Sequence, residues 1–124
     1  MKYFSAAAFA GVMLMAGCAQ TAPGMDGNYT LLEIDGAAIP GTATMQIAGS
    51  AISGQGPCNT YRTNNAAQWP AVALSPIAST RRACITEGGE SAFFAALEQV
   101  TTAERSQDHM MLSGPQHQLT FTAE

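Results

Sequence analysis

Lysine is almost absent from this sequence: Lys2 is the only one in 124 residues. Charged residues make up 11% of the chain, and nine Asp and Glu outnumber five Lys and Arg, which gives a formal net charge of −4. Nucleic-acid binding relies on clustered cations that neutralise phosphates, so this composition argues against a nucleic-acid partner. It also argues against attachment to an anionic membrane surface by charge alone.

Long apolar runs are missing too, except at the N-terminus. Residues 4–16 are apolar or small and carry no charge, and Lys2 precedes them. A run of about 13 residues is too short to span a bilayer, which takes roughly 20, but it suits the apolar region of a secretory signal. We therefore predict a signal peptide over residues 1–17, and no other segment is predicted to cross a membrane.

The run Met15-Ala16-Gly17-Cys18 resembles the lipobox of bacterial lipoproteins, with Met in place of the usual Leu. Small residues before the cysteine give the signal peptidase access to the backbone. The resemblance implies that Cys18 becomes the mature N-terminus, with a diacylglycerol on its thiol and an acyl chain on its amine. Two or three chains anchor a protein firmly, whereas one binds marginally. The alternatives are a plain signal peptide cut nearby and a free cysteine.

The residues after Cys18 bear on where the protein resides. The residue after the cysteine is Ala19 and not Asp. In this respect the chain resembles the outer-membrane lipoproteins of enteric bacteria. Residues 18–27 are small, polar and turn-rich, so they are predicted to form a flexible tether. We expect a cell-envelope protein held by lipid at the outer membrane and facing the periplasm. Without Lys2, four arginines stand against nine acidic residues, a formal charge of −5.

Residues 28–124 are predicted to form one domain made mostly of short strands. Ala43, Met45 and Ile47 alternate with polar residues, which is typical of a strand with one buried face, and Gly49-Ser50 then suits a tight hairpin turn. The candidate strands cover residues 28–35, 43–47, 51–53, 59–63, 101–104, 110–113 and 117–123, with an extended piece at 71–74 and an extended or irregular one at 76–83.

One helix is predicted in the C-terminal half. It begins at Glu87 or Glu90 and ends at Val100, since apolar residues in this stretch recur at helical spacing. Many short antiparallel strands with one late helix indicate an α+β, mostly β fold: a small, cracked antiparallel β-barrel whose opening the helix closes. The apolar helix face consists of Phe93, Phe94, Leu97 and Val100.

A series of short motifs carries a family resemblance. The motifs are Ser53-Gly54, Cys58-Asn59 with an aromatic two residues on, Pro76-Ile77, Thr80-Arg81-Arg82-Ala83-Cys84, a Phe-Phe-Ala-Ala-Leu helix and a final Leu-x-Phe strand. Their order resembles the META domain, the family of HslJ-like heat-shock lipoproteins, over roughly residues 27–124. Pro57 and Thr63 depart from the family pattern, both at one turn.

The resemblance implies a β-rich fold with one helix and a part in stress response, secretion or motility. The family has no agreed catalytic activity, so no catalytic residue is carried over. It implies framework roles for Cys58, Asn59, Thr80 and Cys84.

Cys58 and Cys84 remain as a pair once Cys18 is assigned to the lipid. In an oxidising compartment such a pair is best interpreted as a disulfide, and closing a loop of this length removes roughly 3.5 kcal/mol of unfolded-chain entropy. A redox-active pair usually forms a close Cys-x-x-Cys motif. A metal site needs further ligands, of which only His109 and His117 remain, and two free thiols are the last alternative. No metal or cofactor is predicted.

The two histidines have structural interpretations. His117 is in phase with Leu119 and Phe121, so it is expected to face inward at a strand end as a satisfied structural residue. His109 falls in a predicted turn and is expected to be solvated. No Gly-x-Ser-x-Gly elbow is present, so a hydrolytic triad is not predicted.

The charged pairs are interpreted in the same way. Glu87 and Glu90 resemble the carboxylate pair of a glycosidase, but a solvated helix start explains them. Arg81 and Arg82, if extended, point to opposite faces, so one is expected to pair with a carboxylate inside.

The first functional hypothesis is a non-enzymatic envelope lipoprotein that acts by binding, in stress response or envelope maintenance. Trp69 and Tyr61 are expected in the core or at the barrel rim, where they are candidates for lining a binding cleft. The alternatives are a periplasmic enzyme inhibitor, for example of a cationic lysozyme, and a pilotin-like chaperone that holds a peptide or lipid. An apolar cleft beside the helix would favour the chaperone, and a protruding acidic loop would favour the inhibitor.

Overall fold

The computed structural model describes residue 11 and the ranges 24–84 and 88–124. Nearly all of the predicted signal peptide, the lipidation residue Cys18, most of the tether and Glu87 lie outside the described residues. Within the described ranges, no helix combines the length and the apolar character that a membrane crossing requires.

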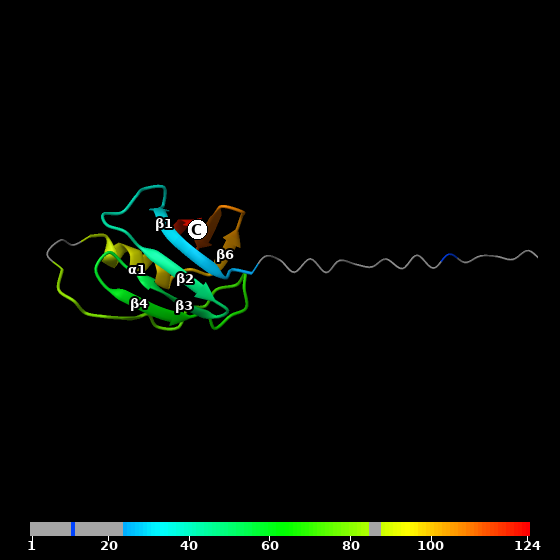
Figure 1. Ribbon diagram of the computed structural model, residues 1–124, viewed down its shortest axis with the longest axis horizontal. Coiled ribbons are helices and arrows are strands. Elements are labelled where there is room, and N and C mark those ends of the chain that lie inside the picture. Colours follow the sequence, from blue (N-terminus) through cyan, green and yellow to red (C-terminus); the bar gives the residue numbers. More distant parts are fainter. Residues whose placement is uncertain (1–10, 12–23, 85–87) are drawn as a thin grey trace, which may run out of the picture.

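Eight antiparallel strands form one sheet in the order β5-β4-β3-β2-β1-β8-β7-β6. One helix, α1, accompanies the sheet in the described part of the chain (Figure 1). This is the α+β, mostly β architecture that the sequence predicts. The bounds are β1 Gly27–Ile34, β2 Thr44–Ala48, β3 Ala51–Gln55, β4 Thr60–Asn64, β5 Ala78–Ser79, α1 Glu90–Glu98, β6 Thr102–Arg105, β7 His109–Ser113 and β8 Gln118–Ala123.

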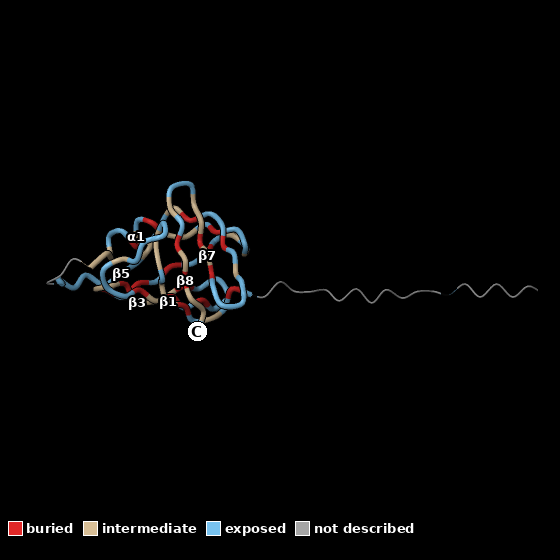
Figure 2. The backbone as a smooth tube through the Cα atoms, turned by 90° about the horizontal axis from the view of Figure 1, so that it is seen from above, coloured by how far each residue is buried: buried red, intermediate tan, exposed pale blue. Residues whose placement is uncertain are grey.

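The predicted alternation of buried and exposed residues holds in the strands. Met45 and Ile47 of β2 are buried, as are Leu119 and Phe121 of β8. The β2–β3 hairpin turns at Gly49, whose φ of 62° is a conformation that glycine adopts without steric cost. Apart from β5, whose two residues are exposed, every strand contributes buried side chains to a single core. The buried residues are the red segments of the backbone tube in Figure 2.

The sheet remains open between its two edge strands, β5 and β6. Residues 70–74 run between the two edges of the sheet. Ala71 forms an isolated bridge with Thr102 on the β6 side, and Leu74 forms one with Asn65 just after β4. The sheet is therefore curled into a barrel that single bridges draw together without a continuous ladder, which accords with the predicted cracked barrel.

Helix α1 covers the inner face with its apolar side. Phe93, Ala96 and Leu97 are buried, and Phe94 is half-buried. The ring of Tyr61 on β4 meets those of Phe93 and Phe94 edge-on, with centroids 5.4 and 5.6 Å apart. Edge-to-face aromatic pairs of this kind add to the energy of apolar burial.

The C-terminal end of α1 is fixed by Gln99. Its side-chain amide donates to the carbonyl of Ala96 at 2.6 Å, and its Oε1 accepts the backbone N–H groups of Gln116 and His117 at 3.0 and 3.1 Å. Val100 is buried immediately afterwards, so the chain leaves the helix in a defined direction toward β6.

Candidate functional site

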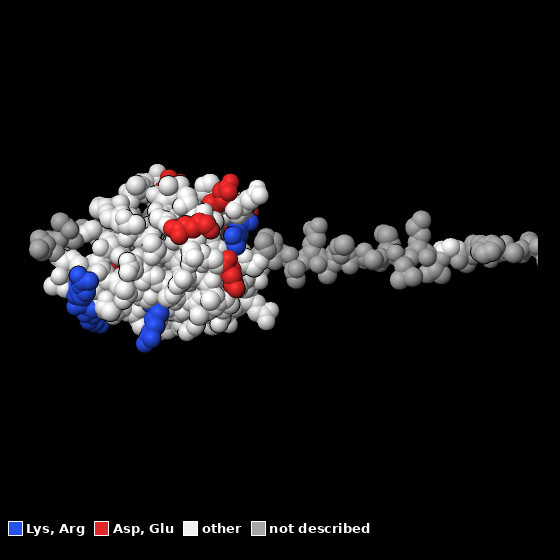
Figure 3. All heavy atoms as spheres, in the orientation of Figure 1, with Lys and Arg blue, Asp and Glu red and all other residues white. Residues whose placement is uncertain are grey.

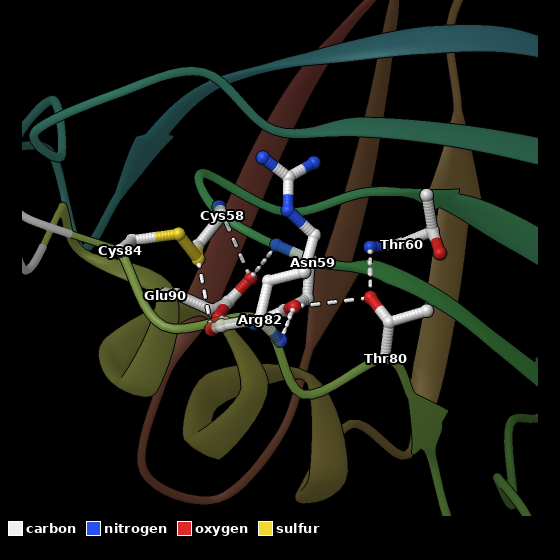
Figure 4. Close-up of a disulfide and its surroundings, with 7 residues drawn as sticks. All are labelled: Cys58, Asn59, Thr60, Thr80, Arg82, Cys84 and Glu90. Carbon is white, nitrogen blue, oxygen red and sulfur yellow. Dashed lines mark hydrogen bonds between the residues drawn. A yellow bond between two sulfur atoms is a disulfide. The ribbon is translucent and has the colours of Figure 1, made fainter.

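A disulfide joins Cys58 and Cys84, with 6.0 Å between their Cα atoms. It connects the turn before β4 to the segment that follows β5, and Figure 4 shows it beside the N-terminal end of α1. Cys58 Sγ also lies 3.4 Å from the carbonyl oxygen of Arg82. The predicted pairing of these two cysteines is present in the structure.

Asn59, next to Cys58, is buried with 8% of its surface exposed. Its Oδ1 accepts two hydrogen bonds, from the Thr80 hydroxyl at 3.0 Å and the Arg82 backbone N–H at 2.6 Å. Its Nδ2 donates to Glu90 Oε2 at 2.8 Å. One amide therefore holds the segment after β5 and the first residue of α1 together (Figure 4). The resemblance assigned Asn59 and Thr80 to the framework, and the structure places them in direct contact.

Glu90 supplies the other half of this cluster. Its Oε1 accepts the backbone N–H groups of Asn59 at 2.6 Å and Cys58 at 3.2 Å. Partial burial raises the pKa of this carboxyl, but the hydrogen bonds from Asn59 and Cys58 outweigh it and hold the pKa of Glu90 below its ordinary value. Gly56 makes room for the carboxylate, because a Cβ there would lie 2.6 Å from Glu90 Oε1.

The expectation that Glu90 is simply a solvated residue at the helix start was wrong. Its carboxylate is half-buried and faces a turn 31 residues earlier in the sequence. Local helix rules predict an acidic residue in this position for its effect on the helix dipole, but they do not predict a distant partner. The only signal in the sequence was the polar Asn59 beside a cysteine expected to be cross-linked.

A second site is the outer face of the sheet, away from α1. Arg62, Ser53 and Gln46 lie side by side across β4, β3 and β2, and Ala78 of β5 and Asn28 of β1 continue the same row. Polar residues of a neighbouring row join them to line an open groove of about 790 Å³. Amides, hydroxyls, the Arg62 guanidinium and the Glu124 carboxylate can bind a polar ligand in extended form.

The prediction that one of the adjacent arginines, Arg81 and Arg82, pairs with a carboxylate inside the domain was wrong. Arg81 and Arg82 are both exposed, and within the described ranges neither is ion-paired with a carboxylate. The backbone of Arg82 enters the Asn59 cluster, and no dashed line in Figure 4 reaches its guanidinium. The inward pairing was predicted from strand alternation, but this segment lies at the sheet edge, where both faces are open to solvent.

His117 does not face inward as predicted. Its side chain is 39% exposed, and its Nδ1 lies 2.6 Å from Asp35 Oδ2. The hydrogen bond from His117, together with one from the Gln118 backbone, lowers the pKa of Asp35. His117 precedes β8 and is held by the loop after β1, so period-two alternation does not govern its direction. His109 is exposed as expected, although it is the first residue of β7 and does not lie in a turn.

The two aromatic candidates occupy different positions. Tyr61 is 3% exposed and donates its hydroxyl to the carbonyl of Thr44 at 2.6 Å, so its side chain belongs to the core. Burial raises the pKa of Tyr61 well above its ordinary value. Trp69 is half-buried, and its indole N–H donates to the carbonyl of Gly49 at 2.9 Å. Across the described residues, no cluster of three or more His, Cys, Asp and Glu side chains is arranged to hold a metal ion.

Comparison with known proteins supports the resemblance seen in the sequence. The chain is similar to a protein from Burkholderia xenovorans whose NMR structure superposes with a TM-score of 0.65, at 26% identity, covering 80% of this chain and 82% of that one. None of the curated proteins matches the chain significantly. The family model described as "META domain" matches residues 22–124, which includes the disulfide, the Asn59 cluster and the outer groove. The chain therefore belongs to the META domain family.

Proposed function

We propose that this protein is a non-enzymatic envelope lipoprotein whose META domain faces the periplasm and acts by binding, in stress response or envelope maintenance. The observation that carries the proposal is the outer groove of about 790 Å³, which presents polar side chains across five strands. The most connected carboxylate, Glu90, has both oxygens engaged by Cys58 and Asn59 and so serves the fold.

The character of the groove bears on the two alternatives. A pilotin-like chaperone would hold its peptide or lipid in an apolar cleft, whereas most residues that line this groove are Thr, Ser, Asn, Gln and Arg, with apolar surface from Tyr29, Met45 and Tyr61 between them. A periplasmic enzyme inhibitor would use a protruding acidic element. Polar binding on the sheet face is therefore the function that the described geometry supports best.

A groove-filling substitution tests this proposal. Ser53 lies in the middle of the row and is only partly exposed, so Ser53→Trp should block the groove and abolish complementation of a deletion strain under envelope stress. Asn64→Trp is the matched control, because Asn64 is exposed on the neighbouring strand and does not line the groove. Equal complementation by both folded variants would contradict the proposal.

The anchor needs its own test. The intact mass of the membrane-extracted protein should exceed that of residues 18–124 by a lipid increment, and Cys18→Ser should remain unprocessed. A soluble species cut at another position would refute the lipid anchor without bearing on the groove.

A further inference from the structure

Only one of the two sheet edges is open in the described part of the chain. At the β6 edge, the N–H of Ala103 donates to the carbonyl of Pro70 at 2.8 Å, and the N–H of Val72 donates to the carbonyl of Thr101 at 2.9 Å. At the opposite edge, β5 pairs with β4 and has no described strand on its other side. An uncovered edge is a template for another strand.

The backbone after β5 presents unpaired groups in a regular pattern. The N–H of Thr80 donates to the carbonyl of Thr60 at 3.0 Å, and the N–H of Arg82 donates to Asn59 Oδ1 at 2.6 Å. Successive N–H groups of an extended chain point to opposite sides, so those of Ser79 and Arg81 point away from β4. Neither has a hydrogen-bond partner among the described residues, and residues 78–84 are all exposed.

Cations gather at this edge while the domain as a whole is acidic. Arg62, Arg81 and Arg82 are exposed, and the one ion pair between described residues is His117–Asp35. In Figure 3 blue groups lie at the lower left, over the β4 side of the domain, and most of the visible red groups lie on the other side. Arg62 is aligned with Ala78, so by strand alternation Arg62 and Arg82 share the outer face.

The edge is also held in place before any partner arrives. Asn59 fixes the residues on either side of Arg81, and the disulfide fixes the segment at Cys84. A segment that is already extended loses little conformational freedom on binding, which favours affinity. Figure 2 shows β5 toward the opposite end of the domain from β7, and residues 78–82 are exposed there to an approaching partner.

The geometry points to residues 78–82 as a docking edge for an acidic, extended segment of a partner protein, which adds to the sheet beside β5 as a further strand. Its backbone bonds to the outward groups of Ser79 and Arg81, and its alternate carboxylates meet Arg62 and Arg82 on the outer face. This mode of recognition obtains affinity from main-chain hydrogen bonds and selectivity from alternate side chains. The inference rests on the proposed binding function and specifies its partner class.

A synthetic peptide of alternating Glu and Thr is the probe, titrated into the full-length protein with its disulfide formed. Two controls keep its length: one replaces Glu by Gln, and the other keeps Glu but carries N-methyl groups on alternate residues. Losing two exposed charge pairs should weaken binding roughly 2- to 30-fold. The methylated peptide should lose binding because it cannot complete the ladder. Amide protons of Ser79 and Arg81 should gain protection from exchange in the complex.

Variants of the protein give an independent readout. The double variant with Arg62→Gln and Arg82→Gln should weaken binding of the acidic peptide as much as replacing the Glu residues of the peptide by Gln does. Arg105→Gln is the matched control, because Arg105 bonds the carbonyls of Gly24 and Asp26 at the other end of the domain. Ser79→Pro removes an outward N–H and should abolish peptide binding, whereas Ser79→Ala keeps this N–H and should bind. If Ser79→Pro fails to fold, the methylated peptide tests the same hydrogen bonds from the ligand side.

Three results would overturn the inference. Peptide-induced shifts confined to Gln46 and Ser53 would place the ligand in the groove, which would leave the proposed function standing. Arginine-dependent binding to phosphatidylglycerol vesicles, without peptide binding, would make the edge a lipid contact. No binding to either probe would refute the docking edge, and complementation by Ser53→Trp would separately decide the proposed function.

Discussion

Replacing Asn59 by alanine is the sharpest test of what holds the disulfide, β5 and α1 together. The change removes an acceptor used by Thr80 and Arg82 and a donor used by Glu90. Each neutral hydrogen bond contributes about 1 kcal/mol and one to a charged group about 1.5–3, so the loss should be roughly 2–4 kcal/mol after water replaces some partners. A domain of this size has a total stability of about 5–15 kcal/mol.

Urea unfolding with the disulfide intact measures this loss. The midpoint of Asn59→Ala should fall by roughly 0.7–4 M, since the slope for small domains is about 1–3 kcal/mol per molar urea. Asn64→Ala is the matched control, because Asn64 is exposed at the far end of β4, the strand that follows Asn59, and only its backbone is hydrogen-bonded. It should remain within about 0.5 kcal/mol of wild type.

An isosteric substitution separates charge from shape. Asn59→Asp keeps the acceptor for Thr80 and Arg82 but sets a second carboxylate against Glu90 Oε2, which lies 2.8 Å from the present amide. Two carboxylates at this distance disfavour joint ionisation, so the variant should be destabilised at neutral pH and recover part of the loss in acid. If Asn59→Ala and Asn64→Ala unfolded at the same urea concentration, the cluster would have no role in stability.

Three further predictions follow from the same contacts. Cys58 and Cys84 should resist alkylation until reduced, and Cys58→Ala should cost roughly 2–5 kcal/mol in urea unfolding; free labelling of both thiols in the folded protein would refute the pairing. The pKa of Glu90 lies below its ordinary value of 4.5, so the contribution of its carboxylate to folding stability is complete above pH 4.5 and is lost as the pH falls through the lower folded-state pKa. Wild type should therefore lose more stability in acid than Glu90→Gln. Parallel stability profiles of the two proteins against pH would contradict this. His117→Gln and His109→Gln should complement a deletion strain under envelope stress, and loss of function with an intact fold would make proton-transfer chemistry the leading hypothesis.

Local pattern was sufficient for most of the fold. The alternation in β2 and β8 and the spacing of Phe93 and Leu97 each depend on neighbours a few residues away, so they can be read from the chain directly. The sequence also predicts an extended piece at 71–74 and an extended or irregular one at 76–83, but it does not predict their role in joining the sheet edges. That role depends on pairing with β4 and β6, which no local signal encodes.

The site was less predictable for the same reason. Glu90 and His117 were assigned from the rules of their own elements, a helix start and a strand end, and both side chains turn instead to loops distant in the sequence. Asn59 and Thr80 are predicted to matter only because of the family resemblance. The resemblance implies a framework role for both residues but does not predict their contacts. Their contact needs the β4–β5 pairing, and this depends on only two residue pairs.

The proximity of the Asn59 cluster to the open edge affects how functional data should be interpreted. Asn59 and the disulfide hold the segment that presents Ser79 and Arg81, so a variant that loosens the cluster would also disturb the edge. Loss of function in Asn59→Ala would therefore not identify Asn59 as a ligand contact. Arg62→Gln avoids this ambiguity, because Arg62 is exposed and its side chain has no bond within the described cluster. A functional defect in that variant, with an unchanged urea midpoint, would show that this side chain contacts the ligand, at the place where the outer groove meets the edge.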